Sequence, residues 1–212
     1  RAEGYLSAQE RRLVLVSPYS PGYFTPGVDV EAGAEALRFL TARGYAELYR
    51  PLSMSCDPCE AQTPAWVDER ERAQTAEGLV IEPYRAERAP AMLEFAAREF
   101  PGDWQRVIRE AATRIEESAD AERLWLAVEQ GTVIGFSHYE GERFGPIGIA
   151  ADQRGRGLGH MLLFRTLGSM SRAGARKAFF LWSNEQTAER LYRSAGFTDA
   201  RRFAVLRKEL PK

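Results

Sequence analysis

The sequence predicts an α+β fold with a mixed central sheet flanked by helices, and three observations lead to this prediction. The 212 residues are 44% hydrophobic and 28% charged, which suits a packed core and excludes wholesale disorder. Apolar residues recur at helical spacing in some segments and in short strand-like runs in others. Antiparallel strands come first and alternating strands and helices follow, an order typical of a mixed sheet.

The first elements of this sheet are expected after residue 78. A strand is predicted at 79–84 and a helix from Pro90 onward. A second helix is expected to begin at Asp103, whose side chain suits an N-cap. Its apolar residues form one stripe that faces a core: Trp104, Val107, Ile108, Ala111 and Ile115. Residues 124–128 and 133–139 are predicted to form a hairpin around a tight turn.

Strands and helices then alternate to the end of the chain. The expected elements are, in order, a strand at 147–150, a glycine-rich turn at 153–159, a helix carrying Leu162, Leu163, Leu167 and Met170 on one side, a strand at 177–183, a helix at 185–195 and one or two closing strands at 202–210. This alternation predicts the part of the sheet that carries a parallel strand pair.

The chain is expected to divide into two domains joined by a linker. Residues 58–78 are polar and charged, contain two prolines and show no apolar periodicity, which is typical of an interdomain linker. The prediction is therefore a partial N-terminal domain at 1–57 and a second domain at 79–212. The first residue is not Met, so we expect that a segment upstream is missing.

The N-terminal part resembles the C-terminal half of the second domain. An offset of 152 residues lays Gly44-Tyr45 on Gly196-Phe197, and Leu40 on Tyr192. Both copies then end in a strand of alternating apolar residues. The sequence therefore predicts a weak internal repeat whose first copy is partial.

Composition limits the kinds of partner. The net charge is −1 and the sequence pI is near 6.3, so bulk electrostatics favours neither nucleic acid nor an anionic membrane, and a small-molecule partner is expected. No apolar run approaches the roughly 20 residues that span a bilayer. Cys56 and Cys59 are the only cysteines, which indicates the cytoplasm, and they supply too few ligands for zinc. We expect two linker thiols, with an incidental disulfide or redox role as the alternative.

The segment Arg154-Gly155-Arg156-Gly157-Leu158-Gly159 lies between a predicted strand and a predicted helix. Glycine allows positive φ and close approach of the backbone, and a helix start supplies unpaired N–H groups and a positive dipole end. Together these features suit a pyrophosphate. The spacing is not a dinucleotide fingerprint, because His160 stands where glycine is needed, and it is not a P-loop. A plain glycine-rich turn is the alternative.

Two motifs in order resemble the GNAT superfamily of acetyl-coenzyme A dependent N-acetyltransferases. They are Arg154-x-x-Gly157-x-Gly159 and the segment from Ala188 to Gly196-Phe197, and the resemblance covers about residues 79–210. It implies that the turn holds the pyrophosphate of the co-substrate acetyl-CoA. It also implies that strands 147–150 and 179–183 splay apart so that pantetheine slips between them.

The resemblance assigns a set of coenzyme-binding residues: Ile147, Gly148, Ile149, Arg154, Gly155, Arg156, Gly157, Leu158, Gly159, Asn184 and Tyr192. A backbone N–H on Gly148 or Ile149 could face the thioester oxygen, and a glycine at 148 would allow that close approach. Asn184 stands one residue farther from Ala188 than is usual in the family, so its contact with the coenzyme is the least secure part of the set.

Candidate catalytic groups follow from the same resemblance. The family uses a tyrosine at the place of Tyr192 to protonate the departing thiolate, and a core aromatic is the alternative reading. Glu140 and Glu142 precede strand 147–150 and could accept the proton of the amine through water, and His138 is a third candidate. For each of these three, a solvated or structurally satisfied side chain is the alternative.

The expected activity is acetyl transfer from acetyl-CoA to a primary amine of a small molecule or peptide. Direct attack in a ternary complex is expected, because neither cysteine lies near the motif, and no metal is implied. The N-terminal copy carries Leu40 in place of Tyr192, so it should have no catalytic activity of its own. Its strands must pair with the second domain, with a missing segment or with another chain, as in a homodimer. The alternatives are a non-catalytic acyl-CoA-binding regulatory module and a pure interaction domain.

Overall fold

The computed structural model describes residues 13–16, 25–100 and 102–210, with the backbone alone for 13–16 and Asp103. The chain forms two compact units. The larger unit comprises Cys56–Phe179 and Leu191–Phe197, and the smaller unit comprises Arg1–Ser55, Phe180–Arg190 and Thr198–Lys212. The division therefore falls at residues 55 and 56 and again within the C-terminal part, instead of following a single linker.

The larger unit is built on a mixed sheet, as the sequence predicts. Four strands pair antiparallel in chain order, and the first residues of a fifth run parallel to the fourth, with Arg143 paired to Phe179. The strands are β5 (Leu79–Pro83), β6 (Leu124–Glu129), β7 (Thr132–Glu140), β8 (Arg143–Ile149) and the start of β9 (Ala178–Ser183), whose residues from Phe180 onward belong to the smaller unit. The predicted hairpin is β6 and β7, joined at Gln130-Gly131.

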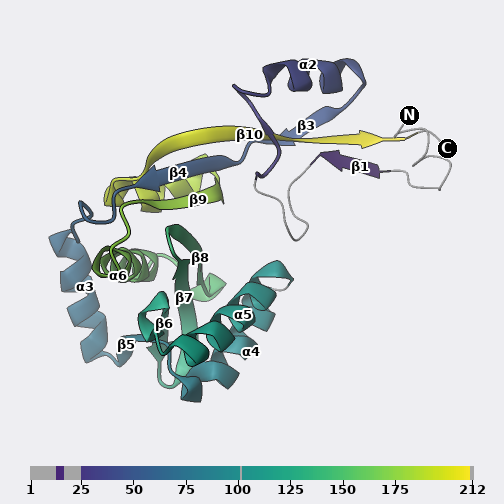
Figure 1. The fold of residues 1–212 in the computed structure, drawn as a ribbon. Coiled ribbons are helices and arrows are strands. Elements are labelled where there is room, and N and C mark those ends of the chain that lie inside the picture. The colour runs from purple at the N-terminus through teal and green to yellow at the C-terminus, as the bar shows by residue number, and fades with distance from the viewer. Residues whose placement is uncertain (1–12, 17–24, 101, 211–212) are drawn as a thin grey trace. The chain divides into compact units, whose positions relative to one another are not determined.

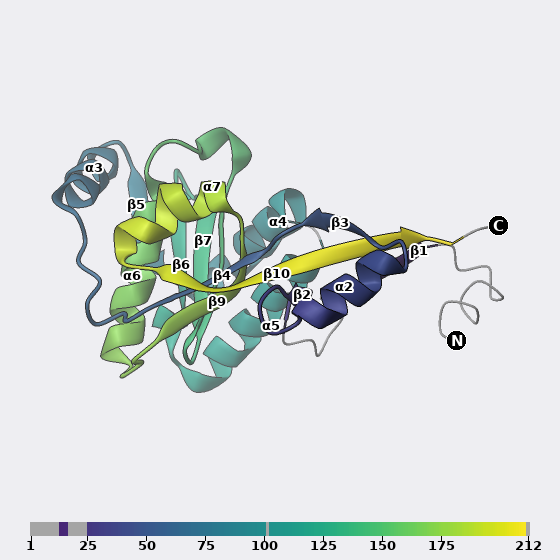
Figure 2. The same cartoon turned by 90° about the horizontal axis from the view of Figure 1, so that it is seen from above.

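Helices cover both faces of the β5 to β8 sheet (Figures 1 and 2). They are α4 (Ala89–Glu99) and α5 (Asp103–Ser118) on one face and α6 (Leu158–Arg172) on the other. The alternation of β7 explains this arrangement. Phe136 points into an aromatic cluster with Phe95 and Phe100, whereas the hydroxyl of the next residue, Ser137, accepts a 2.8 Å hydrogen bond from Thr166 of α6. Gly102, one residue before the expected Asp103, is the N-cap of α5.

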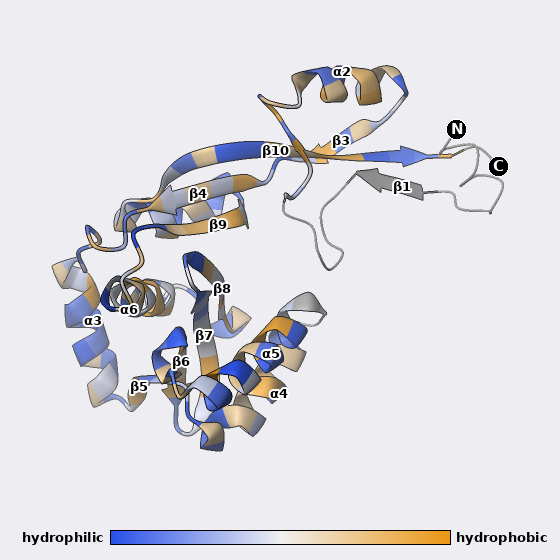
Figure 3. Ribbon diagram, viewed as in Figure 1, coloured by the Kyte–Doolittle hydropathy of each residue, from blue (hydrophilic) through white to orange (hydrophobic). Residues whose placement is uncertain are grey.

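Helix α3 (Ala65–Ala76) occupies most of the segment expected to be a linker. Val67 and Gln74 are buried, and Arg165 of α6 pairs with Glu71 at 2.6 Å, so the segment is part of the larger unit. Figure 3 colours most of α3 as hydrophilic. The segment expected to be an interdomain linker therefore contains a 12-residue helix. Polar side chains that pair with distant residues hold this helix, and such contacts leave no apolar period in the sequence.

The smaller unit is organised around β10 (Thr198–Glu209), which pairs antiparallel with several strands from the start of the chain. Its other elements are β1 (Leu13–Val16), β2 (Val28–Asp29), α2 (Ala34–Ala42), β3 (Ala46–Tyr49), β4 (Leu52–Cys56) and α7 (Glu185–Thr187). β4 pairs with β10, and Ser53 Oγ donates a 2.8 Å hydrogen bond to the carbonyl of Phe180, which belongs to the same unit. N-terminal strands thus pair with C-terminal ones, which is one of the three outcomes expected.

The helix predicted at 185–195 forms as α7 followed by a π-helix at Ala188–Tyr192 and a 3₁₀ turn at Arg193–Ala195. The two segments related by the 152-residue offset end their helical parts in the same way. Gly44 and Gly196 both have φ of +81°. The N–H of Tyr45 donates to the Leu40 carbonyl at 3.1 Å, and the N–H of Phe197 donates to the Tyr192 carbonyl at 3.3 Å. This shared turn is the geometry that the alignment of Leu40 with Tyr192 requires. An internal repeat stays a prediction.

Among the residues that the structure describes, no helix combines the length and the apolar character needed to cross a lipid bilayer.

Candidate active site

The glycine-rich segment forms a tight connection between β8 and α6, as the sequence predicts. A 3₁₀ turn at Ala151–Gln153 follows β8, and α6 begins at Leu158 with Gly157 as its N-cap. Gly155 and Gly157 have φ of +84° and +88°, in the left-handed region that favours glycine. The first N–H groups of a helix have no partner within that helix, so they and the dipole of α6 make this turn attractive to an anion.

The two arginines of the turn have different surroundings. Arg154 is exposed and forms no ion pair with any described residue. Arg156 is held from several sides: its guanidinium donates to Glu129 at 2.6 and 3.1 Å, to Gln74 Oε1 at 3.0 Å and to Gln153. It also holds the pKa of Glu129 below its usual value, mainly through the hydrogen bond. The side chain of Arg156 therefore fixes the turn, whereas the sequence analysis placed it against the coenzyme.

Helix α3 contributes residues that the sequence analysis missed. Gln74 Nε2 donates a 2.8 Å hydrogen bond to the Arg156 carbonyl. A methyl group added at Gly157 would lie 2.8 Å from Cδ of Arg70 and 3.6 Å from the ring of Trp66. The spacing of Trp66, Arg70 and Gln74 at i, i+4 and i+8 places them on one side of a helix, and this was the available signal.

Strand β8 leads into the turn and contains an irregular pairing. Ser137 pairs with Ile147 and Tyr139 with Phe144, so His138 alone faces Gly145 and Pro146 in a bulge. Gly148 follows this bulge.

The glycine at 148 serves packing. A methyl group added there would lie 2.6 Å from the ring of Phe100, at the end of α4. The space on the Cβ side of this Cα is therefore filled by Phe100, and close approach of the coenzyme to Gly148 stays a prediction.

A cavity of about 570 Å³ lies beside the entry to the glycine turn. It is lined by the end of α4, the β6–β7 hairpin and the residues that follow β8: Arg98, Glu99, Glu129, Gln130, Thr132, Ile134, Ala150, Ala151, Asp152 and Gln153. Its volume falls in the range of small-molecule sites. Glu129 thus connects the cavity wall to Arg156 and the turn.

Tyr192 is buried among aromatic rings of the larger unit. Only 7% of it is exposed, and its ring centroid lies 6.1 Å from that of Phe144 and 5.5 Å from that of Phe197. Burial raises the pKa of its hydroxyl, so the phenol keeps its proton at neutral pH. The preceding residue, Leu191, lies 3.6 Å from the place of a Cβ on Gly159. The structure therefore brings the Tyr192 segment to the first turn of α6.

The three candidate bases lie at the opposite end of β8 from the glycine turn, or beside its bulge. Glu140 pairs with Arg114 at 3.0 Å, with both side chains nearly half exposed, and Glu142 is exposed in the turn before β8. His138 is buried, with Nδ1 3.3 Å from the Gly145 carbonyl. Burial lowers the pKa of His138 to about 4, so at neutral pH its imidazole is uncharged.

Asn184 belongs to the smaller unit, where its side chain has a structural partner. Its Oδ1 accepts a 2.8 Å hydrogen bond from the Thr187 N–H and so caps α7. Its contact with a coenzyme stays a prediction.

Both cysteines are free thiols. Burial raises the pKa of Cys56 to about 12, and exposed Cys59 accepts a 3.3 Å hydrogen bond from Ser171 Oγ. No group of three or more His, Cys, Asp or Glu side chains that could hold a metal ion occurs in residues 13–16, 25–100 and 102–210.

Comparison with known families identifies one domain. Residues 120–199 match the model of a family described as an acetyltransferase (GNAT) domain. This match includes β6 to β9, the glycine turn, α6 and Tyr192. No curated protein matches this chain.

Solved structures share the fold. A GCN5-related glucosamine N-acetyltransferase region of a fungal multi-domain GH3 β-N-acetylglucosaminidase aligns with a TM-score of 0.74 at 17% identity, covering 96% of this chain and 26% of that one. A GCN5-related N-acetyltransferase from Sphaerobacter thermophilus aligns with a TM-score of 0.69 at 23% identity, covering 98% and 65%. A tandem GNAT protein from the clavulanic acid biosynthesis pathway aligns with a TM-score of 0.56 at 17% identity, covering 100% and 68%. This chain thus spans about a quarter of the length of the fungal protein and just under two thirds of the length of the Sphaerobacter protein.

Proposed function

We propose that this chain, whose residues 120–199 match the model of an acetyltransferase (GNAT) domain, transfers acetyl from acetyl-CoA to a primary amine. The observation that carries the proposal is the connection between β8 and α6. Two glycines with positive φ, the N-terminus of a 15-residue helix and Arg154, which pairs with no carboxylate of the described residues, meet there. A diphosphate suits this combination of N–H donors and positive charge.

The residues present fit coenzyme A. The N–H groups of Gly157, Leu158 and Gly159 would bind the diphosphate, with Arg154 beside them. The amide groups of the pantetheine arm would pair with backbone groups of Ile147 to Ile149, as an added strand would. Bound acetyl-CoA supplies the acetyl group as an activated thioester.

Tyr192 is the proposed proton donor. The Tyr192 phenol is protonated at neutral pH, so it holds a proton that the leaving sulfur can take. The amine must lose a proton, and Glu140 or Glu142 through water, or the neutral imidazole of His138, would accept it.

Direct transfer to the amine fits the state of the cysteines. A thiolate is the reactive form of cysteine, and burial raises the pKa of Cys56 so far that it stays a thiol at neutral pH. The proposal therefore contains no acetyl intermediate on Cys56, and both substrates bind before transfer.

The test is a mixture of the protein, acetyl-CoA and one amine at a time, with release of free thiol as the readout. The panel contains amino acids, amino sugars including glucosamine, small amines and peptides with free N-termini. We expect thiol release with at least one amine and its loss in Tyr192→Phe. Coenzyme binding without release by any amine would favour the regulatory module. An absence of coenzyme binding would contradict both readings.

A further inference from the structure

The side of α3 that faces the glycine turn carries an arginine with no assigned role. We propose that α3 forms an additional wall of the coenzyme site and that Arg70 binds a phosphate group of coenzyme A. This inference rests on the proposed function, because it takes the coenzyme to lie at the turn.

Three residues of α3 contact the turn at successive points. Gln74 exchanges two hydrogen bonds with Arg156, of 2.8 and 3.0 Å. Arg70 places its Cδ beside Gly157, where a Cβ would stand 2.8 Å away. The ring of Trp66 packs edge-on against His160 of α6, with centroids 4.8 Å apart. Arg70 therefore lies beside Gly157, the N-cap of α6, where the proposed anion site begins.

The guanidinium of Arg70 has no carboxylate partner among the described residues. It lies over the ring of Trp66, 5.6 Å from its centroid. Nearby arginines are neutralised, because Arg156 pairs with Glu129 and Arg165 with Glu71. Within the part of the chain that the structure describes, Arg70 and Arg154 thus remain without an ion pair around the first turn of α6, and a phosphate group would pair with both.

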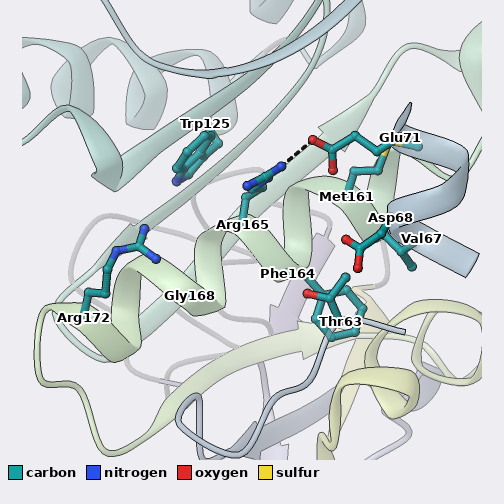
Figure 4. A pocket seen from close by; sticks show the side chains of 10 residues that line it. All are labelled: Thr63, Val67, Asp68, Glu71, Trp125, Met161, Phe164, Arg165, Gly168 and Arg172. Carbon is teal, nitrogen blue, oxygen red and sulfur yellow. Dashed lines mark hydrogen bonds and ion pairs between the residues drawn. The ribbon is translucent and has the colours of Figure 1, made fainter. Parts of the chain in front are cut away.

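The helix that carries Arg70 is well anchored. Val67 and Gln74 are buried, and Figure 4 shows the ion pair of Glu71 with Arg165 that joins α3 to α6 beside a cavity of about 210 Å³. A guanidinium presented from a fixed helix loses less conformational entropy on binding than one presented from a mobile segment.

Calorimetric titration with coenzyme A tests the proposal, and α3 offers a matched control. Arg72 carries the same charge on the same helix, but its Nε donates to the Asp68 carbonyl at 3.2 Å within that helix. We expect Arg70→Ala to weaken binding about tenfold or more, as loss of a charge-assisted hydrogen bond does, and Arg72→Ala to change it less than about twofold. Melting temperatures of both variants confirm that each is folded.

Dephospho-coenzyme A distinguishes the two sources of phosphate. If Arg70 binds the 3′-phosphate, the wild type and Arg70→Ala bind this analogue equally. If Arg70 binds the 5′-diphosphate, the weakening persists. Either result supports the proposal. The proposal is overturned if Arg70→Ala leaves coenzyme binding unchanged, strengthens it, or weakens it no more than Arg72→Ala does. Each of these results would leave the proposed function standing. Failure of the wild type to bind coenzyme A would instead refute both.

Discussion

The burial of Tyr192 keeps its hydroxyl protonated at neutral pH, and the proposed acid role of this residue can be tested by one substitution. Tyr192→Phe should lower kcat by about a hundredfold, the lower range for general acid catalysis, with little change in KM for acetyl-CoA. Tyr139→Phe is the control, because Tyr139 is also a buried tyrosine of the larger unit. Equal rates in Tyr192→Phe and wild type would remove the acid role.

His138 gives the unfolding free energy a pH dependence of known sign. Its pKa is about 4 in the fold and near the ordinary 6.5 in the unfolded chain, so the unfolded chain binds the proton more strongly. The stability associated with neutral His138 is complete above pH 6.5 and should fall by up to about 3 kcal/mol as the pH drops to 4.

Denaturant unfolding across this pH range, compared with His138→Gln, measures the effect. The variant should lose this part of the pH dependence, whereas His160→Gln should retain it. A curve for His138→Gln that parallels the wild type would show that the imidazole titrates normally.

Single residues also show why part of the site escaped prediction. The glycines of the turn and Tyr192 belong to local motifs, so the sequence is sufficient to propose them. Arg156 belongs to the same motif, but its partners Glu129 and Gln74 lie 27 and 82 residues away. Nothing in the local pattern distinguishes an arginine that fixes the turn from one that meets a ligand.

At the scale of elements, the turn before α6 depends on a glycine that both conformation and packing require. In Gly157→Ala, the left-handed φ costs about 1 kcal/mol and the new methyl group meets Arg70. We expect weaker coenzyme binding by calorimetry. Gly174→Ala, at the other end of α6, carries the same strain at φ of +84° in open space. It should leave binding unchanged, and equal effects of both variants would point to general destabilisation.

The ion pair between Glu129 of β6 and Arg156 of the turn should strengthen coenzyme binding at the same site. Glu129→Gln removes the charge that holds Arg156, so the turn should become less ordered and the Kd for coenzyme A should rise several-fold. Glu122→Gln removes a comparable charge from the pair with Arg172 at the far end of α6 and serves as the control. Unchanged binding in Glu129→Gln would show that the turn is ordered without this pair.

Elements differ in how far their sequences reveal them. The β6–β7 hairpin and α6 carry periodic apolar residues around clear turn signals, and both form as predicted. Helix α3 buries only two residues and is stabilised by polar contacts to α6 and the turn, so its sequence resembles a linker. The bulge in β8 depends on its pairing with β7, which no single strand encodes.

At the scale of the whole molecule, one coenzyme is expected per chain. Leu40 has no hydroxyl, and residues 25–33 before α2 contain no counterpart of the glycine turn. The N-terminal segment contributes strands to β10 and should bind no coenzyme of its own. Calorimetry should therefore give a stoichiometry of one, and a value of two would contradict a silent N-terminal half.

The central claim is that backbone N–H groups at the start of α6 bind the coenzyme, and nuclear magnetic resonance with ¹⁵N-glycine labelling tests it most directly. Addition of coenzyme A should shift the amide signals of Gly155, Gly157 and Gly159, while that of Gly174 stays in place. Signals of the three turn glycines that do not move at saturating coenzyme A would contradict the account.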